Sequence, residues 1–178
     1  MKRFAFFCAA CVLIVFAAPS YGVDRKYLDA AALQELNEDA PDFSIKGGGS
    51  RMISLKDLRG KVIILHFWAI WCKPCREEFP AFERLYDDFK DKDFAFLAVS
   101  IDEKVSREEL NEFAKTLGAG FPVYLAMEGD ITDRYWSWGV PLTYFIDKKG
   151  RIAGRKIGQG NWDGDNVRKL IKALLEER

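Results

Sequence analysis

Two cysteines separated by two residues, Cys72 and Cys75, are the side chains in this sequence best suited to chemistry. Their thiolates are nucleophiles, and the pair can alternate between a dithiol and a disulfide. The apolar pattern predicts a strand before Cys72 and a helix after it, so unpaired N–H groups at the helix start should lower the pKa of Cys72. Cys75, one turn further in, should face the core. The pattern therefore predicts Cys72 as the attacking thiolate and Cys75 as the resolving thiol.

Two other uses of a cysteine pair fit the sequence less well. A zinc site needs two further ligands, and His66 is the single histidine of the chain, so no metal is expected. A purely structural disulfide is the second alternative, but closing so short a loop removes little chain entropy. The remaining cysteines, Cys8 and Cys11, lie in the apolar N-terminal segment and add no disulfide to the rest of the chain.

Residues 1–22 resemble an export signal. Lys2 and Arg3 precede an unbroken apolar run, and small residues follow it near Ser20 and Gly22. The run is short for a membrane-spanning helix, so cleavage is predicted, with an uncleaved N-terminal anchor as the alternative. An exported protein whose remaining thiols form one Cys-x-x-Cys pair is expected to use a disulfide as a reagent.

Charge excludes one class of partner. The chain has 27 basic and 27 acidic residues, and loss of Lys2 and Arg3 with the leader would leave a small acidic excess. Such a balance does not support nucleic-acid binding.

The elements that must position the cysteines form a strand, helix, strand, helix order followed by a hairpin and a last helix. This order predicts an α/β domain with a mixed central sheet, parallel first and antiparallel at its end, and helices on both faces. Residues 23–40 are predicted to form a helical N-terminal extension, and residues 41–178 the domain itself. The expected strands are Lys61–Trp68, Phe94–Val99, Leu142–Ile146 and Ile152–Ile157, and the expected helices begin near Cys72, at Ser106 and near Asp163.

The segment from Phe67 to Cys75, with the letters FWAIWCKPC, is followed by Glu78-Phe79-Pro80 and resembles the thioredoxin superfamily, in particular periplasmic thiol-disulfide oxidoreductases of the TlpA/ResA/CcmG type. The resemblance extends from about residue 40 to the C-terminus. It implies a thioredoxin-like fold, a redox-active disulfide with no dissociable cofactor, and a periplasmic or otherwise extracytoplasmic location. It also implies a reductase that acts on exported proteins, apocytochrome c among the candidates, and that is recharged by a membrane electron donor such as a DsbD/CcdA-like protein.

Three residues near the pair are candidates for tuning its acidity or relaying a proton. Glu78 follows Cys75 by three residues on the same helix face, where a carboxylate would raise a thiol pKa, and the resemblance implies this role. Lys73 would favour the Cys72 thiolate by direct attraction. His66 stands where thioredoxins carry a buried acid, which departs from the family pattern. It could accept the Cys75 proton, or it could be a hydrogen-bonded core residue.

Three further residues are candidates for substrate binding. Trp71 is predicted to lie on the surface beside the cysteines as an apolar contact for a partner, whereas Trp68 is expected in the core. The resemblance implies that Pro141 is cis and faces the dithiol, which would offer the Val140 backbone to an extended substrate segment. Sequence alone also allows a trans proline that begins a strand.

These inferences predict an enzyme that exchanges disulfides with exported protein partners, acting as a reductase. A thiol peroxidase on the same scaffold is one alternative. The other is a binding module or chaperone in which the cysteine pair is incidental.

Overall fold

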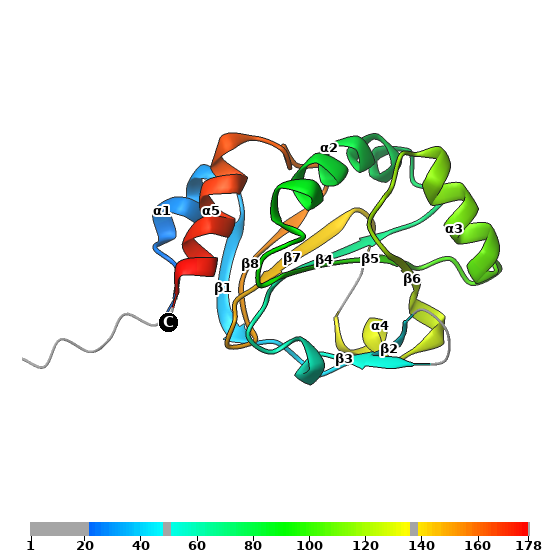
Figure 1. Cartoon of the computed structure of the whole chain (residues 1–178), viewed down its shortest axis with the longest axis horizontal. Coiled ribbons are helices and arrows are strands. Elements are labelled where there is room, and N and C mark those ends of the chain that lie inside the picture. The colour runs from blue at the N-terminus through cyan, green and yellow to red at the C-terminus, as the bar shows by residue number, and fades with distance from the viewer. Residues whose placement is uncertain (1–21, 48–50, 136–138, 178) are drawn as a thin grey trace, which may run out of the picture.

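The computed structural model describes residues 22–47, 51–135 and 139–177, in which strands and helices alternate along most of the chain (Figure 1). The helices are α1 (Arg25–Ala30), α2 (Lys73–Phe89), α3 (Arg107–Thr116), α4 (Ile131–Arg134) and α5 (Asp165–Glu176). The strands are β1 (Gln34–Asp39), β2 (Ser44–Lys46), β3 (Met52–Ser54), β4 (Val62–Trp68), β5 (Phe94–Ser100), β6 (Val123–Leu125), β7 (Leu142–Ile146) and β8 (Arg151–Ile157). Two short 3₁₀ turns cover Lys56–Leu58 and Ala126–Glu128.

Six of these strands form one mixed sheet in the order β1-β8-β7-β4-β5-β6. The strands β4, β5 and β6 run parallel, and β7, β8 and β1 are antiparallel to their neighbours. This confirms the predicted α/β fold with a mixed sheet that is parallel first and antiparallel at its end. The strands β2 and β3 form a separate antiparallel pair.

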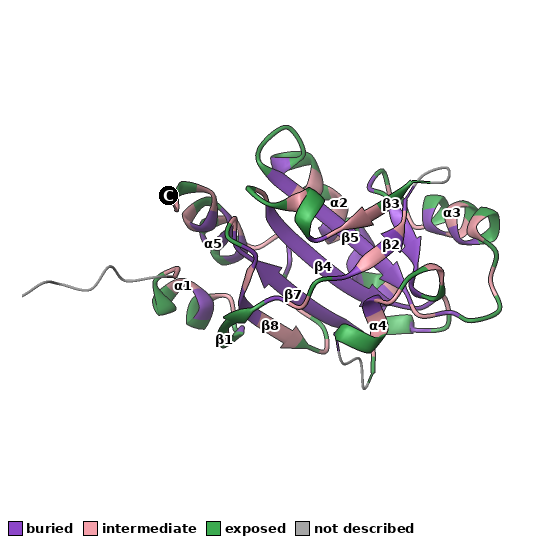
Figure 2. Ribbon diagram, turned by 90° about the horizontal axis from the view of Figure 1, so that it is seen from below, coloured by how far each residue is buried: buried purple, intermediate pink, exposed green. Residues whose placement is uncertain are grey.

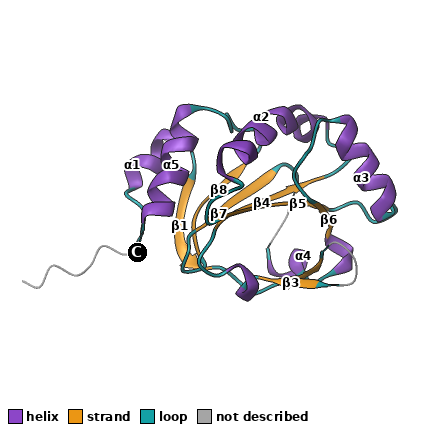
Figure 3. Cartoon of the chain, in the orientation of Figure 1, coloured by secondary structure: helices purple, strands orange, loops and turns teal. Residues whose placement is uncertain are grey.

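The centre of the sheet is buried on both faces, as the apolar runs predict (Figure 2). Every residue of β4 is buried, and successive side chains point to opposite faces. One face packs against α1, α2, α3 and α5, and the other against α4 and the β2–β3 pair (Figure 3). Two layers of apolar contacts therefore hold β4, which carries the chain to the cysteine pair.

The helix α2 follows β4 after a short connection and begins at the cysteines. Cys72 is its N-cap residue, and the helix continues through Pro80. Phe79, Phe82 and Phe89 extend its buried face, which packs on the sheet. The first turn is fixed in place because this aromatic row anchors the helix along its length.

The other predicted elements also form. The helix α3 begins with a capping box in which Ser106 and Glu109 exchange hydrogen bonds between side chain and backbone. The strands β7 and β8 form the predicted hairpin, and the predicted last helix, α5, buries Val167, Leu170, Ile171 and Leu174. Two short strands, β2 and β3, lie on either side of residues 47–50, of which 48–50 lie outside the described part.

The N-terminal extension differs from its prediction. The expected helix ends at Ala30, the chain turns at Ala32 with a φ of 55°, and the following residues form β1. This strand pairs antiparallel with β8 and becomes an edge of the main sheet. Helical propensity in a short charged segment is weak, so pairing with the open edge of β8 decides its structure. The predicted leader lies outside the described residues except for Gly22, and no helix of the described part is long and apolar enough to cross a bilayer.

Candidate active site

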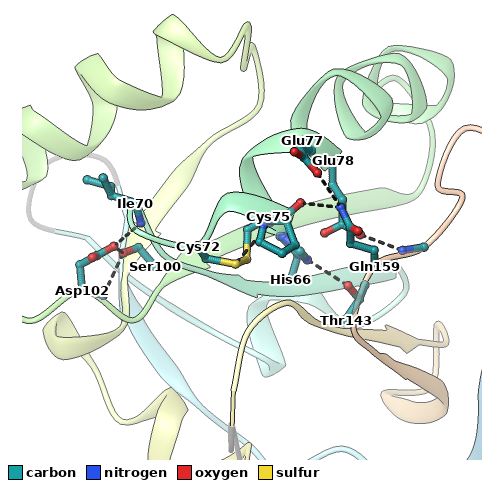
Figure 4. The surroundings of a disulfide bond; sticks show 12 residues. His66, Ile70, Cys72, Cys75, Glu77, Glu78, Ser100, Asp102, Thr143 and Gln159 are labelled. Carbon is teal, nitrogen blue, oxygen red and sulfur yellow. Dashed lines mark hydrogen bonds between the residues drawn. A yellow bond between two sulfur atoms is a disulfide. The ribbon is translucent and has the colours of Figure 1, made fainter.

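Cys72 and Cys75 form a disulfide at the beginning of α2 (Figure 4). Their sulfur atoms are 2.04 Å apart, and the connection that carries them leaves the carboxyl end of β4. Cys72 is 4% exposed and Cys75 is fully buried at 0%. The difference has the predicted direction, although both residues are buried in the disulfide form.

The helix start points a backbone donor at Cys72. The Cys75 N–H donates to Cys72 Sγ at 3.2 Å, and the Arg76 N–H donates to the Cys72 carbonyl oxygen at 3.2 Å. N–H groups at a helix N-terminus stabilise negative charge on an atom placed there. The geometry therefore favours a thiolate on Cys72 over a thiolate on Cys75.

Glu78 lies one helical turn after Cys75 and is the buried carboxyl group nearest to it along α2 (Figure 4). The side chain is 4% exposed. Its Oε1 accepts two hydrogen bonds, from the indole N–H of Trp162 at 2.6 Å and from the backbone N–H of Gly160 at 2.8 Å. Its Oε2 is buried and has no hydrogen-bond partner among the described residues.

These surroundings place the titration of Glu78 near neutral pH. Burial raises the pKa of the carboxyl group to about 7, while the hydrogen bonds from Gly160 and Trp162 oppose that rise by favouring the charged form. A carboxyl group with such a pKa exchanges protons readily at physiological pH, which is what a general acid and base requires. Since both donors occupy Oε1, a proton on neutral Glu78 must reside on Oε2.

His66 lies in β4 with its ring against Phe82, at 4.5 Å between ring centroids, and is completely buried. Its Nδ1 is 2.9 Å from Thr143 Oγ1, and its Nε2 has no partner in the described part of the chain. Burial lowers the pKa of His66 to about 3. The ring is therefore neutral at pH 7 and is a poor acceptor for the Cys75 proton, which favours the interpretation as a hydrogen-bonded core residue.

Lys73, between the two cysteines, is exposed. Its amino group lies 3.8 Å from the Glu77 carboxylate, one turn further along the helix. Such surface pairs contribute little energy, but the carboxylate offsets part of the lysine charge. The attraction predicted between Lys73 and the Cys72 thiolate is correspondingly reduced.

The three predicted substrate-binding residues lie around this end of the sheet. Trp71 is 68% exposed directly before Cys72, whereas Trp68 is buried. The Val140–Pro141 peptide bond is cis. Leu142 pairs with Phe67, so Pro141 lies opposite the carboxyl end of β4. The connection to Cys72 begins at this end of the strand.

Asp102 is a supporting residue that the sequence interpretation missed. It is buried, and its Oδ2 accepts hydrogen bonds from the backbone N–H of Ile70 at 2.9 Å and from the Ser100 hydroxyl at 2.7 Å. It thereby holds the connection between β4 and Cys72 to the end of β5 (Figure 4). The available signal was a Ser-x-Asp at the carboxyl end of a parallel strand, the edge where functional groups collect.

The connection between β8 and α5 was missed as well. Gln159 donates from its side-chain amide to the Pro74 carbonyl oxygen and to Glu77, both at 3.2 Å. Together with the bonds from Gly160 and Trp162 to Glu78, these contacts bind the connection to the first turns of α2. No sequence signal marked them, because the partners are more than 80 residues apart. Within the described residues, no group of three or more His, Cys, Asp or Glu side chains is arranged to hold a metal ion.

Comparison with known proteins gives a consistent result. Residues 36–155 match the AhpC/TSA family. The chain is 39% identical over 122 residues to the thioredoxin-like protein YneN of Bacillus subtilis, covering 68% of this chain and 71% of that protein. It is 34% identical over 178 aligned residues to the thiol-disulfide oxidoreductase ResA of Oceanobacillus iheyensis, covering 97% of this chain and 90% of the relative.

Solved structures resemble the fold. A protein from Chlorobium tepidum, described as a thiol:disulfide interchange protein DsbE, superimposes with a TM-score of 0.68 at 30% identity. The superposition covers 80% of this chain and 99% of the other. The similarity therefore includes almost the whole of that protein.

Proposed function

The chain belongs to the AhpC/TSA family of thioredoxin-like proteins and is a thiol-disulfide oxidoreductase related to ResA, and from this premise we propose that it reduces disulfides in exported protein partners. One observation carries the proposal: a Cys-x-x-Cys disulfide at a helix start, with a buried glutamate one turn behind it, whose pKa burial raises to about 7. The cysteine pair supplies the two electrons, and Glu78 accepts the Cys75 proton and later returns it.

The forward reaction starts from the reduced pair. The Cys72 thiolate attacks one sulfur of the partner's disulfide, and the other partner sulfur leaves as a thiolate with the electron pair. The Cys75 thiol then gives its proton to Glu78, and the resulting thiolate attacks Cys72 Sγ. The second partner sulfur leaves, so the partner gains two electrons and the Cys72–Cys75 disulfide forms.

The protein must then be recharged. One thiolate of a donor dithiol attacks Cys72 Sγ, Cys75 leaves as a thiolate, and neutral Glu78 returns a proton to it. The second donor thiolate then attacks the donor sulfur bound to Cys72, so that Cys72 leaves as a thiolate and the donor becomes a disulfide. Both electrons travel through sulfur in each direction, so the reaction needs no dissociable cofactor. We propose a membrane electron donor of the DsbD/CcdA type as the source of that dithiol, and apocytochrome c cysteines as one class of substrate.

The surface around Cys72 is the proposed docking site for the partner. Trp71 offers an exposed apolar ring beside the cysteine. The Val140–Pro141 segment stands at the same sheet edge, where the Val140 backbone would pair with an extended segment of the substrate. Residues 1–22 would direct export, and without cleavage they would serve as a membrane anchor that holds the domain outside the cytoplasm.

The reduction potential tests the proposed direction of electron flow. We expect equilibration with a glutathione or dithiothreitol redox buffer to give a value close to that of thioredoxin, about −270 mV, rather than that of DsbA, about −120 mV. Mass spectrometry of the alkylated mixture would measure the oxidised fraction at each ratio. A potential near the DsbA value would make the protein an oxidant and refute the reductase proposal, and rapid consumption of hydrogen peroxide by the reduced protein would favour a thiol peroxidase.

A further inference from the structure

The connection from β8 to α5 donates hydrogen bonds to two adjacent glutamates of α2, Glu77 and Glu78, but the two contacts differ. Glu77 is exposed and receives one bond from Gln159 at 3.2 Å. Glu78 is buried and receives two shorter bonds, from Gly160 at 2.8 Å and from Trp162 at 2.6 Å, both on the same oxygen. The buried contact fixes one carboxyl oxygen completely and leaves the other without a partner among the described residues.

The indole of Trp162 is itself rigidly held. It is 1% exposed, and its ring stacks on Phe82 with ring centroids 5.0 Å apart and an interplanar angle of 18°. It also lies 6.2 Å from the ring of Phe145 in β7. Packing from α2 on one side and the sheet on the other therefore determines where the indole N–H points, so the bond to Glu78 cannot be lost by simple side-chain rotation.

We propose that Trp162 is a positioning residue for the exchange reaction: with the Gly160 N–H it holds Glu78 by Oε1, so that Oε2 carries the proton exchanged with Cys75. The inference rests on the proposed function for the role of the proton and adds the residue that orients its carrier. Two N–H donors on one oxygen leave a single site for the proton. They also favour the ionised carboxylate and so oppose the effect of burial on it.

The substitution Trp162→Phe isolates this contact because phenylalanine keeps a stacking ring and removes the indole N–H. We expect the titration midpoint of Glu78, followed in the oxidised protein by ¹³C NMR of its carboxyl carbon, to rise by about one pH unit or more above the wild-type value. The sign follows from the loss of a donor that stabilises the charged form. An unchanged midpoint in a folded variant would overturn the proposal.

Trp68→Phe is the matched control. Trp68 is also buried in the same apolar cluster, but its indole N–H has no hydrogen-bond partner among the described residues. Its replacement removes the same group from the same type of surroundings and should leave the Glu78 midpoint within a few tenths of a pH unit of wild type. An equal shift in both variants would indicate a general packing effect and would contradict the proposal.

A measurement on the unaltered protein covers the case in which Trp162→Phe does not fold. The indole ¹H–¹⁵N resonance of Trp162 should move with pH with the midpoint of the Glu78 carboxyl group, about 7, whereas that of Trp68 should not. If the Trp162 indole resonance does not change as Glu78 titrates, the hydrogen bond between the two side chains is refuted.

The rate of mixed-disulfide resolution, measured as a function of pH, distinguishes this inference from the proposed function on which it rests. If Trp162→Phe shifts the Glu78 titration and also shifts the pH dependence of mixed-disulfide resolution, both hold. If the titration shifts and the resolution rate has no dependence on Glu78, the positioning contact stands and the proton role of Glu78 fails. In a Glu78→Gln background, the further change Trp162→Phe should leave the pH profile unchanged, since no titrating carboxyl group remains.

Discussion

A Cys75→Ser variant is expected to accumulate mixed disulfides with its protein partners, whereas a Cys72→Ser variant is expected to form none. Cys75 is the more deeply buried of the two residues, and the helix N–H groups favour a thiolate on Cys72, so we expect Cys72 to be the attacking atom. Without Cys75, the intermediate has no thiol to resolve it. In both variants, turnover should fall to the rate of the reaction without protein.

The measurement is non-reducing electrophoresis followed by mass spectrometry of the trapped species, with the protein expressed in its native compartment and alkylated before lysis. The double variant Cys72→Ser/Cys75→Ser is the control and should capture nothing. Mixed disulfides that form through Cys75 in the Cys72→Ser variant would reverse the assignment. Retention of the cellular function by the double variant would support a binding module or chaperone instead.

Replacement of Glu78 by glutamine should slow the resolution of the mixed disulfide by about 10²-fold, the usual contribution of a general base. In the wild type, the carboxyl group has a pKa of about 7 and accepts the Cys75 proton in its ionised form. The resolution rate should therefore rise as the pH increases through about 7. The recharging reaction needs the neutral acid, so its rate should fall over the same interval.

Stopped-flow fluorescence of tryptophans near the disulfide would follow both steps. In Glu78→Gln, both profiles should lose the inflection near neutral pH. Glu77→Gln is the matched control, because it removes the neighbouring carboxylate on the exposed side of α2 and should keep the inflection. An inflection that survives in Glu78→Gln would assign the proton transfer to another group.

The strands and helices whose buried residues form a continuous or periodic apolar pattern could be predicted from the sequence. The predicted strand Lys61–Trp68 became the fully buried β4, and the helix predicted to begin near Cys72 became α2, which buries Phe79, Phe82 and Phe89. The edge strand β1 and the short β6 were not predicted. Their structure depends on pairing with β8 and β5, and the exposed, charged sequence of β1 shows no apolar pattern.

The site residues divide in the same way, into those placed by local sequence spacing and those placed by contacts between distant segments. The cysteine pair and Glu78 are close in sequence, so helical spacing alone places them together. The cis peptide before Pro141 came from family resemblance and is confirmed. The position of Asp102 two residues after Ser100, at the end of a parallel strand, was a usable signal, but its bond to Ile70 was not predictable. The contact of Trp162 with Glu78 joins segments with no common pattern and exists only after the sheet and α2 have packed.

We propose that the start of α2 makes Cys72 the attacking sulfur and that Cys75, one turn further into the helix, acts as the resolving thiol. The most direct test is the pH dependence of alkylation of each thiol in the freshly reduced protein, resolved by peptide mass spectrometry after a short pulse of iodoacetamide. We predict that Cys72 is alkylated at neutral pH at least about tenfold faster than Cys75. Two thiols that react at equal rates, or that are both inert at neutral pH, would contradict the account.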